Sequence, residues 1–120
     1  MITETITEIL TEARTALESL TITVTDQPHE AVSALVAGVP ALLVLASPTI
    51  EYMTWTQAEA TWTLWALAPT TDPREAATTF EPILAALVEA LGIDRAQPET
   101  YDIRDRTFPG YTLTLTTQHS

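Results

Sequence analysis

Apolar residues recur at two different spacings along the chain, and each spacing predicts a different element. In residues 2–20 they fall three or four positions apart, which predicts an amphipathic helix. Residues 21–25, TITVT, alternate and predict a half-buried strand with Ile22 and Val24 facing inward. Residues 40–46 are apolar on both faces, which predicts a central strand of a sheet.

Residues 59–68, EATWTLWALA, predict a strand that carries a tryptophan on each face. One face is wholly apolar and consists of Ala60, Trp62, Leu64, Ala66 and Ala68. The other face begins polar, at Thr61 and Thr63, and turns apolar at Trp65 and Leu67. We therefore expect a cover over only the far end of this second face. Another part of the same chain or another copy of the chain would supply that cover.

Capping residues predict a second, long helix. Asp72 is suited to the N-cap, Pro73 to the first helical position, and Glu75 follows three residues after the cap. Apolar residues then recur at helical spacing as far as Leu91, and Gly92 is suited to end the helix. These residues predict a helix that packs one face against the core.

The remaining elements complete an α+β order. Residues 50–55 and 111–117 alternate as strands, and residues 28–37 predict a short helix that ends at Gly38. The sequence thus predicts one α+β domain over residues 1–120. We expect a mainly antiparallel sheet of about four to five strands, with the N-terminal helix and the second long helix packed on one face.

Residues 94–110, DRAQPETYDIRDRTFPG, fit neither spacing. They mix acidic residues with arginines and prolines, and we interpret them as a loop that is too long for a simple connector. Long loops of this kind are usually functional or disordered. Tyr101, Ile103 and Phe108 favour a functional loop, because disordered segments contain few aromatic and β-branched residues.

Composition excludes several kinds of chemistry. None of the 120 residues is cysteine, so disulfides, thiolate nucleophiles and cysteine zinc sites are absent from the sequence. Nucleotide-binding, hydrolase, zinc-protease and calcium-loop motifs do not occur, and we interpret His29, in the turn or helix start at residues 26–30, as a loop histidine rather than a catalytic one. We therefore expect no catalytic residue, no cofactor and no metal site. The protein is predicted not to be an enzyme, so its function should come from its surfaces.

Charge argues against two classes of partner. The net charge is −11, and all five basic residues are arginines, which is the wrong balance for a protein that binds nucleic acid phosphates. Residues 31–50 are apolar enough to suggest a membrane span, but Gly38 and Pro40 interrupt them and no basic residue flanks them. The first residues also lack the pattern of a signal peptide. We expect neither specific DNA binding nor a membrane-spanning segment.

The order of elements and several short segments resemble the tail terminator (minor tail, neck-proximal) proteins of long-tailed bacteriophages, particularly those of actinobacterial hosts. The resemblance follows the N-terminal helix and continues through PALLV at 40–44, SPTIEY at 47–52, WTLWALA at 62–68, DPREAA at 72–77, EPILAAL at 81–87 and PGYTL at 109–113. It covers nearly the whole chain, although it contains no single diagnostic motif.

This resemblance implies a structural virion protein that forms a homo-hexameric ring on the end of the tail tube. Such a ring terminates tail tube polymerisation and provides the head–tail joining surface. Its partners would be its own copies, the tail tube protein and a head-side neck or connector protein, while DNA passes through the lumen without specific binding. The expected location is the neck-proximal end of the virion tail, and the host cytoplasm during assembly.

The physical reading of the residues then suggests a subunit or partner interface. We predict that it includes Trp65, Leu67, Tyr101, Ile103, Arg104, Arg106 and Phe108. Two alternatives remain open. The chain is also compatible with another neck ring protein, namely a head-completion or stopper protein. It is further compatible with a small cytosolic ligand-binding α+β module in which Trp55, Trp62 and Trp65 line an apolar pocket.

Overall fold

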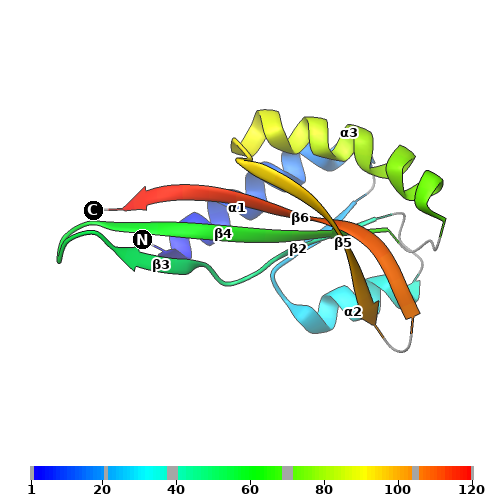
Figure 1. The fold of residues 1–120 in the computed structure, drawn as a ribbon, viewed down its shortest axis with the longest axis horizontal. Coiled ribbons are helices and arrows are strands. Elements are labelled where there is room, and N and C mark those ends of the chain that lie inside the picture. The colour runs from blue at the N-terminus through cyan, green and yellow to red at the C-terminus, as the bar shows by residue number, and fades with distance from the viewer. Residues whose placement is uncertain (1, 21, 38–40, 69–71, 104–105, 120) are drawn as a thin grey trace.

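A mixed six-stranded sheet organises the chain, with helices on both of its faces (Figure 1). This computed structural model describes residues 2–20, 22–37, 41–68, 72–103 and 106–119. In chain order the elements are α1 (Ile2–Leu17), a 3₁₀ turn (Glu18–Leu20), β1 (Thr23–Thr25), α2 (Pro28–Ala37), β2 (Leu42–Leu45), β3 (Thr49–Tyr52), β4 (Ala58–Leu67), α3 (Pro73–Leu91), β5 (Arg95–Ile103) and β6 (Arg106–His119).

The sheet has the strand order β1-β2-β4-β6-β5, and β3 pairs with β4 outside that path. Strands β1 and β2 are parallel, whereas every other pairing is antiparallel. The predicted α+β class and the mainly antiparallel sheet are therefore confirmed. The sheet has more strands than expected because β5 lies in the segment that was interpreted as a loop.

The main core lies between the sheet and the two long helices, α1 and α3, which pack on one face as predicted. Its largest fully buried side chains include Trp62 and Leu64 from β4, Leu17 from α1, and Phe80 and Leu87 from α3. The Trp62 Nε1–H donates a hydrogen bond of 2.8 Å to Thr117 Oγ1 on β6. This bond satisfies the one polar group of a side chain that is otherwise surrounded by apolar atoms.

Helix α2 covers part of the opposite face of the sheet. It packs against β1 and β2, where Ala31 meets Leu42 and Val44 in a small second cluster of buried residues. Alternate residues of β2 thus face α2, while Leu43 and Leu45 face the main core. This arrangement confirms the prediction of a strand that is buried on both sides, and it confirms the short helix.

The caps of α3 explain why that helix begins and ends where it does. The Asp72 carboxylate accepts a hydrogen bond of 3.0 Å from the backbone N–H of Arg74. Gly92 adopts the left-handed conformation, with φ 66° and ψ 50°, and its N–H donates to the Val88 carbonyl oxygen at 3.1 Å. Glycine adopts this backbone conformation without the steric cost of a Cβ.

The interpretation of residues 94–110 as a loop is wrong, because most of these residues form the antiparallel β5–β6 hairpin. Strand β5 is the edge of the sheet, with only β6 beside it. Charged residues and proline are tolerated on an edge strand and protect it from pairing with other chains. Pro98 occupies such a position opposite Tyr111. The composition that looked like a loop is therefore the composition of an edge strand.

A β-arm formed by β3, β4 and the end of β6 extends beyond the helices and gives the molecule its long dimension of 46 Å (Figure 1). We call residues 52–57, at the turn between β3 and β4, the arm tip. The turn contains no glycine or asparagine. Instead, Thr54 Oγ1 accepts hydrogen bonds from the backbone N–H groups of Thr56 and Gln57, at 3.3 and 3.1 Å.

Candidate functional site: an apolar arm tip and the α2 cavity

An apolar hollow, which we call the α2 cavity, lies between α2, the sheet and the end of β5. Its volume is about 260 Å³. The lining residues are Ala31, Val32, Leu42, Val44, Trp65, Leu67, Tyr101 and Asp102. The strand register explains their convergence, because Val44 lies opposite Trp65 and Leu42 lies opposite Leu67 on the same face of the sheet. Three residues of the predicted interface therefore meet in one place.

The chain itself covers only part of this apolar face. Leu67 is buried in the monomer and lies in the lining of the α2 cavity, so it is not a free surface residue, and its place at an interface stays a prediction. Trp65 remains 39% exposed beside it. Farther along the same face, Thr61 and Thr63 are partly exposed, as their polar side chains predict. The protein's own chain thus covers Leu67 and leaves part of the Trp65 side chain exposed to solvent.

Tyr101 forms the wall of the α2 cavity on the β5 side. Its hydroxyl oxygen lies 2.6 Å from Thr112 Oγ1. Its ring lies across Gly110, where a Cβ atom would come within 2.7 Å of Tyr101 Cε2 and would also meet the backbone carbonyl oxygen of Ala66. Burial raises the pKa of the Tyr101 phenol above its ordinary value. The phenol therefore stays neutral at physiological pH.

The remaining predicted interface residues are distributed differently. Phe108 is 5% exposed and is buried within its own chain, so it does not provide the surface that the loop interpretation gave it. It lies directly opposite Tyr101 in the β5–β6 hairpin. Ile103 and Arg106 pair with each other at the end of that hairpin. Arg104 lies outside the described residues.

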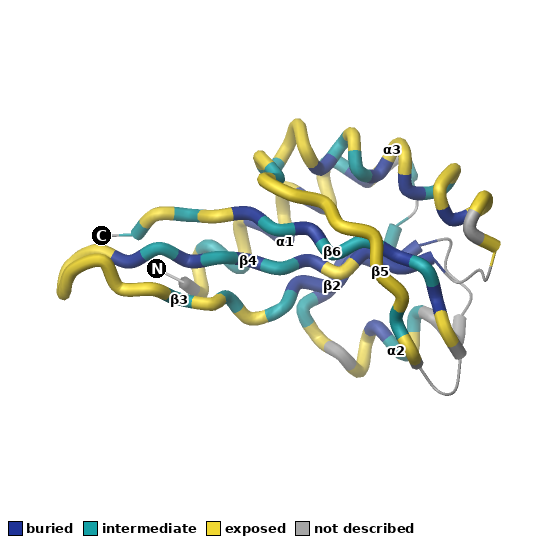
Figure 2. Tube along the Cα trace, viewed as in Figure 1, coloured by how far each residue is buried: buried dark blue, intermediate teal, exposed yellow. Residues whose placement is uncertain are grey.

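The arm tip is the most exposed apolar feature of the described chain, and sequence reasoning missed it. Trp55 is 94% exposed, Tyr52 72% and Met53 57%. Figure 2 shows the whole turn as exposed, at the end of the arm away from the helices. Large apolar side chains in a turn that lacks glycine and asparagine were the available indication, because surface turns usually carry small polar residues.

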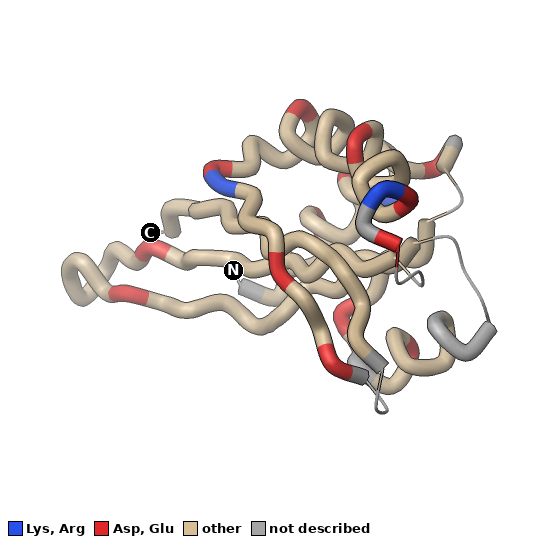
Figure 3. The backbone as a smooth tube through the Cα atoms, turned by 45° about the vertical axis from the view of Figure 1, so that its right-hand side comes forward, with Lys and Arg blue, Asp and Glu red and all other residues tan. Residues whose placement is uncertain are grey.

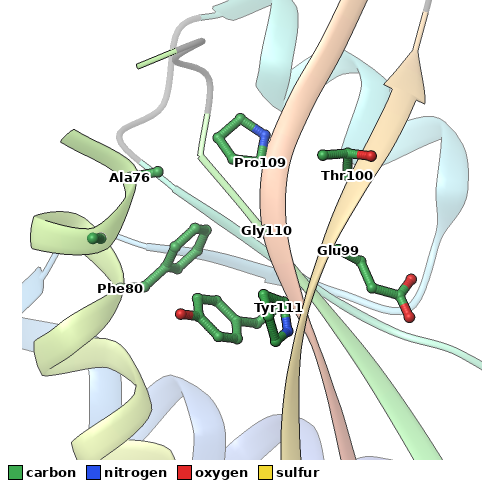
Figure 4. A pocket seen from close by; sticks show the side chains of 9 residues that line it. Ala76, Phe80, Glu99, Thr100, Pro109, Gly110 and Tyr111 are labelled. Carbon is green, nitrogen blue, oxygen red and sulfur yellow. The ribbon is translucent and has the colours of Figure 1, made fainter. Parts of the chain in front are cut away.

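A second hollow of about 530 Å³ lies between α3 and the β5–β6 hairpin (Figure 4). Phe80 and Tyr111 form its floor with an edge-to-face contact, with ring centroids 5.5 Å apart and planes at 78°. Glu99 is the one ionisable carboxylate in its lining, and its side chain points away from the two rings. A lone carboxylate without a nucleophile or a base beside it does not make a catalytic arrangement.

The three tryptophans do not share a pocket, which contradicts the structural basis of the ligand-binding alternative. Trp62 is fully buried in the main core, and Trp65 lies on the opposite face of the same strand. Trp55 is at the arm tip. The tryptophans therefore have three separate roles in the structure, in the core, at the cavity and on the exposed turn.

Acidic residues are spread over α3, the arm and β5, as the colouring of the backbone in Figure 3 shows. Arg14, one of the few described basic residues, donates a hydrogen bond of 3.1 Å to the Val24 carbonyl oxygen. Within the described ranges, no group of three or more histidine, aspartate or glutamate residues is arranged to hold a metal ion. No helix within those ranges is long and apolar enough to cross a membrane.

Comparison with known proteins does not identify a family for this chain. No protein-family model matches the chain, and no curated protein matches it either. Functional inference therefore starts from the two apolar features described above. One is a projection, the arm tip, and the other is a hollow, the α2 cavity.

Proposed function

We propose that this protein is a structural virion protein that forms a ring on the end of a phage tail tube and stops tube polymerisation there. The ring would also present the surface that joins the tail to the head. The observation that carries the proposal is the arm tip, where Trp55 is 94% exposed at the end of a projecting hairpin. A large exposed apolar group of this kind typically marks an interaction site.

The positions of the two apolar features favour a ring over a simple dimer. A closed ring needs a heterologous interface, in which two different patches of one subunit's surface meet on neighbouring copies. The arm tip and the α2 cavity are different patches. The turn between β3 and β4 lies at one end of the molecule, and α2, which lines the cavity, lies toward the other end (Figure 1). Head-to-tail contacts between such patches close into a ring when the rotation between subunits permits.

The net charge of −11 supports a ring through which DNA passes. Carboxylates repel phosphates, so an acidic lumen would allow DNA to slide without holding it. The resemblance of the element order to tail terminators supports the tail end as the place of the ring. The described residues also include no arginine cluster that would suit a DNA-binding surface.

The proposal is tested by removing the gene from its phage or prophage and imaging the tails by electron microscopy. With the protein present, we expect tubes of uniform length that carry a ring at one end. Without it, we expect tubes of uncontrolled length, and supplying the gene in trans should restore uniform length. Tails of unchanged length in the deletion would contradict tube termination. Normal-length tails that fail to join heads would instead assign the protein to another neck ring.

A further inference from the structure

We infer that Trp55 of one subunit inserts into the α2 cavity of the next copy of the chain. The inference rests on the proposed ring, because it names the two patches that such a ring brings together. Sequence reasoning placed Trp65 and Tyr101 at an interface without a matching group on the partner. The arm tip supplies that group.

The α2 cavity suits an indole in size. An engineered protein cavity of about 150 Å³ is large enough to bind benzene. The α2 cavity, at about 260 Å³, can therefore take the larger bicyclic side chain. Its walls are mostly aliphatic, and the partly exposed ring of Trp65 can meet a second aromatic ring edge-to-face or offset.

The cavity also contains an acceptor for the one polar group of an indole. Asp102 is exposed and lines the cavity. One of its carboxylate oxygens, Oδ1, accepts a hydrogen bond of 2.7 Å from Thr107 Oγ1. A carboxylate has about four acceptor positions, so Asp102 can also accept from an indole N–H. The lining thus matches the apolar body of Trp55 and its polar edge.

The geometry favours a second copy as the occupant. The arm points away from the body, along the 46 Å axis of the molecule, so the tip of a chain does not reach the cavity of the same chain (Figure 1). A membrane surface is a poor alternative partner for the tip. Anionic lipid surfaces attract basic segments, whereas this arm carries Glu51 and Glu59 within a chain of net charge −11.

The small surface area of the arm tip makes the stability of this contact depend on ring closure. An aromatic side chain buries about 150–250 Å², so the arm tip offers on the order of 400 Å² in total. A stable two-protein interface buries about 800 Å² on each partner. One contact of this kind is therefore weak. In a closed ring each subunit makes the contact twice, once with its arm tip and once with its cavity. The step that closes the ring therefore forms one more contact without binding another subunit, which strengthens an assembly of individually weak contacts.

Site-directed cross-linking can test the contact directly, because the chain contains no cysteine. One protein carries Thr56→Cys beside Trp55, and a second, differently tagged protein carries Val32→Cys in the cavity wall. The matched control replaces Val32→Cys with Thr11→Cys, an exposed position on α1 at the other face of the sheet. The proteins are mixed at the highest soluble concentration with a short bis-maleimide, and circular dichroism verifies that each variant is folded.

We expect the 56–32 pair to give a mixed-tag dimer well above the 56–11 control. The Thr56→Cys/Val32→Cys double variant should give a ladder of larger species. Adding Trp55→Ala should weaken association roughly thirtyfold, as expected for a buried aromatic anchor, and return the yield to the control level. A yield no higher than the control, or one that is insensitive to Trp55→Ala, would overturn the contact.

The outcome separates this inference from the proposed function. Rings seen on tail ends together with no 56–32 cross-link would overturn the Trp55 contact and leave the proposed function standing. The cross-link together with unchanged tail length in the deletion phage would support the contact and remove the role on the tail.

Discussion

Trp62 and Trp65 lie three residues apart on β4, and the two faces that they occupy serve different purposes. Trp62 is fully buried under α1 and α3, with its indole N–H bonded to Thr117. Trp65 is 39% exposed at the edge of the α2 cavity. The first face holds the monomer together, whereas the second is only partly covered by its own chain. We expect substitutions on the two faces to separate stability from assembly.

The polar half of the second face strengthens this contrast. Thr61 lies directly opposite Thr116, and Thr63 lies directly opposite Thr114. Cross-strand threonine pairs stabilise a sheet while remaining compatible with water. The second face is therefore stable without complete cover, and its apolar end is free to serve another purpose.

The largest expected effect on stability comes from Trp62→Ala. Loss of a fully buried aromatic side chain should lower the free energy of unfolding by about 3–5 kcal/mol. Urea denaturation measures this change, and Trp55→Ala is the matched control, because loss of an exposed side chain should change stability by less than about 0.5 kcal/mol. Equal midpoints for the two variants would show that the contrast between buried and exposed tryptophans is wrong.

Gly110→Ala should have the next largest effect, because there is no room for a Cβ between the backbone of Ala66 and the ring of Tyr101. The added Cβ meets the Tyr101 ring and the Ala66 carbonyl oxygen. Overpacking of this kind costs about 1–3 kcal/mol. Denaturation of the single variants and of Gly110→Ala/Tyr101→Ala gives the coupling between the two sites. Additive losses would mean that the ring does not press on residue 110.

Asp72→Ala should lower stability by about 1 kcal/mol, because it removes the side-chain cap of α3. Asp72→Asn is the matched control, since asparagine caps a helix about as well as aspartate. Thermal melting distinguishes them. Equal melting temperatures for Asp72→Ala and Asp72→Asn, whether at the wild-type value or below it, would contradict the role of Asp72 as the N-cap of α3.

Tyr101 should make a small contribution to the pH dependence of stability. Burial raises its pKa above 10.0 in the folded state, so the unfolded chain releases the proton more readily. This contribution is complete below the unfolded pKa and is lost as the pH rises through the folded pKa. The stability advantage of wild type over Tyr101→Phe should therefore shrink above about pH 10. A constant difference across that range would contradict the buried phenol.

Sequence patterns predicted the elements whose periods were clear. Helices α1 and α3, the doubly buried β2 and the two unlike faces of β4 all follow from spacing and capping residues. Strand β5 was missed because Pro98 and its charged neighbours match a loop as well as an edge strand. The distinction depends on which strand lies beside it, and local sequence does not contain that information.

The candidate site was only partly predictable for the same reason. The change from Thr63 to Trp65 indicated an apolar end on the second face. Tyr101 reaches this end only through the β5–β6 hairpin. The exposure of Trp55 depends on how far the arm extends beyond the helices, which no local period encodes. Both the cavity and the exposed tip depend on which strands lie side by side, and local sequence does not specify that arrangement.

Trp65→Asp tests the central claim most directly, because it places a charge at the α2 cavity while leaving the main core intact. The measurement is electron microscopy of tails assembled with this variant, alongside thermal melting of the isolated protein. We predict cooperative melting, no ring on the tube ends and tails of uncontrolled length. An unfolded variant would show that Trp65 belongs to the core, and rings of normal appearance would show that this face plays no part in assembly.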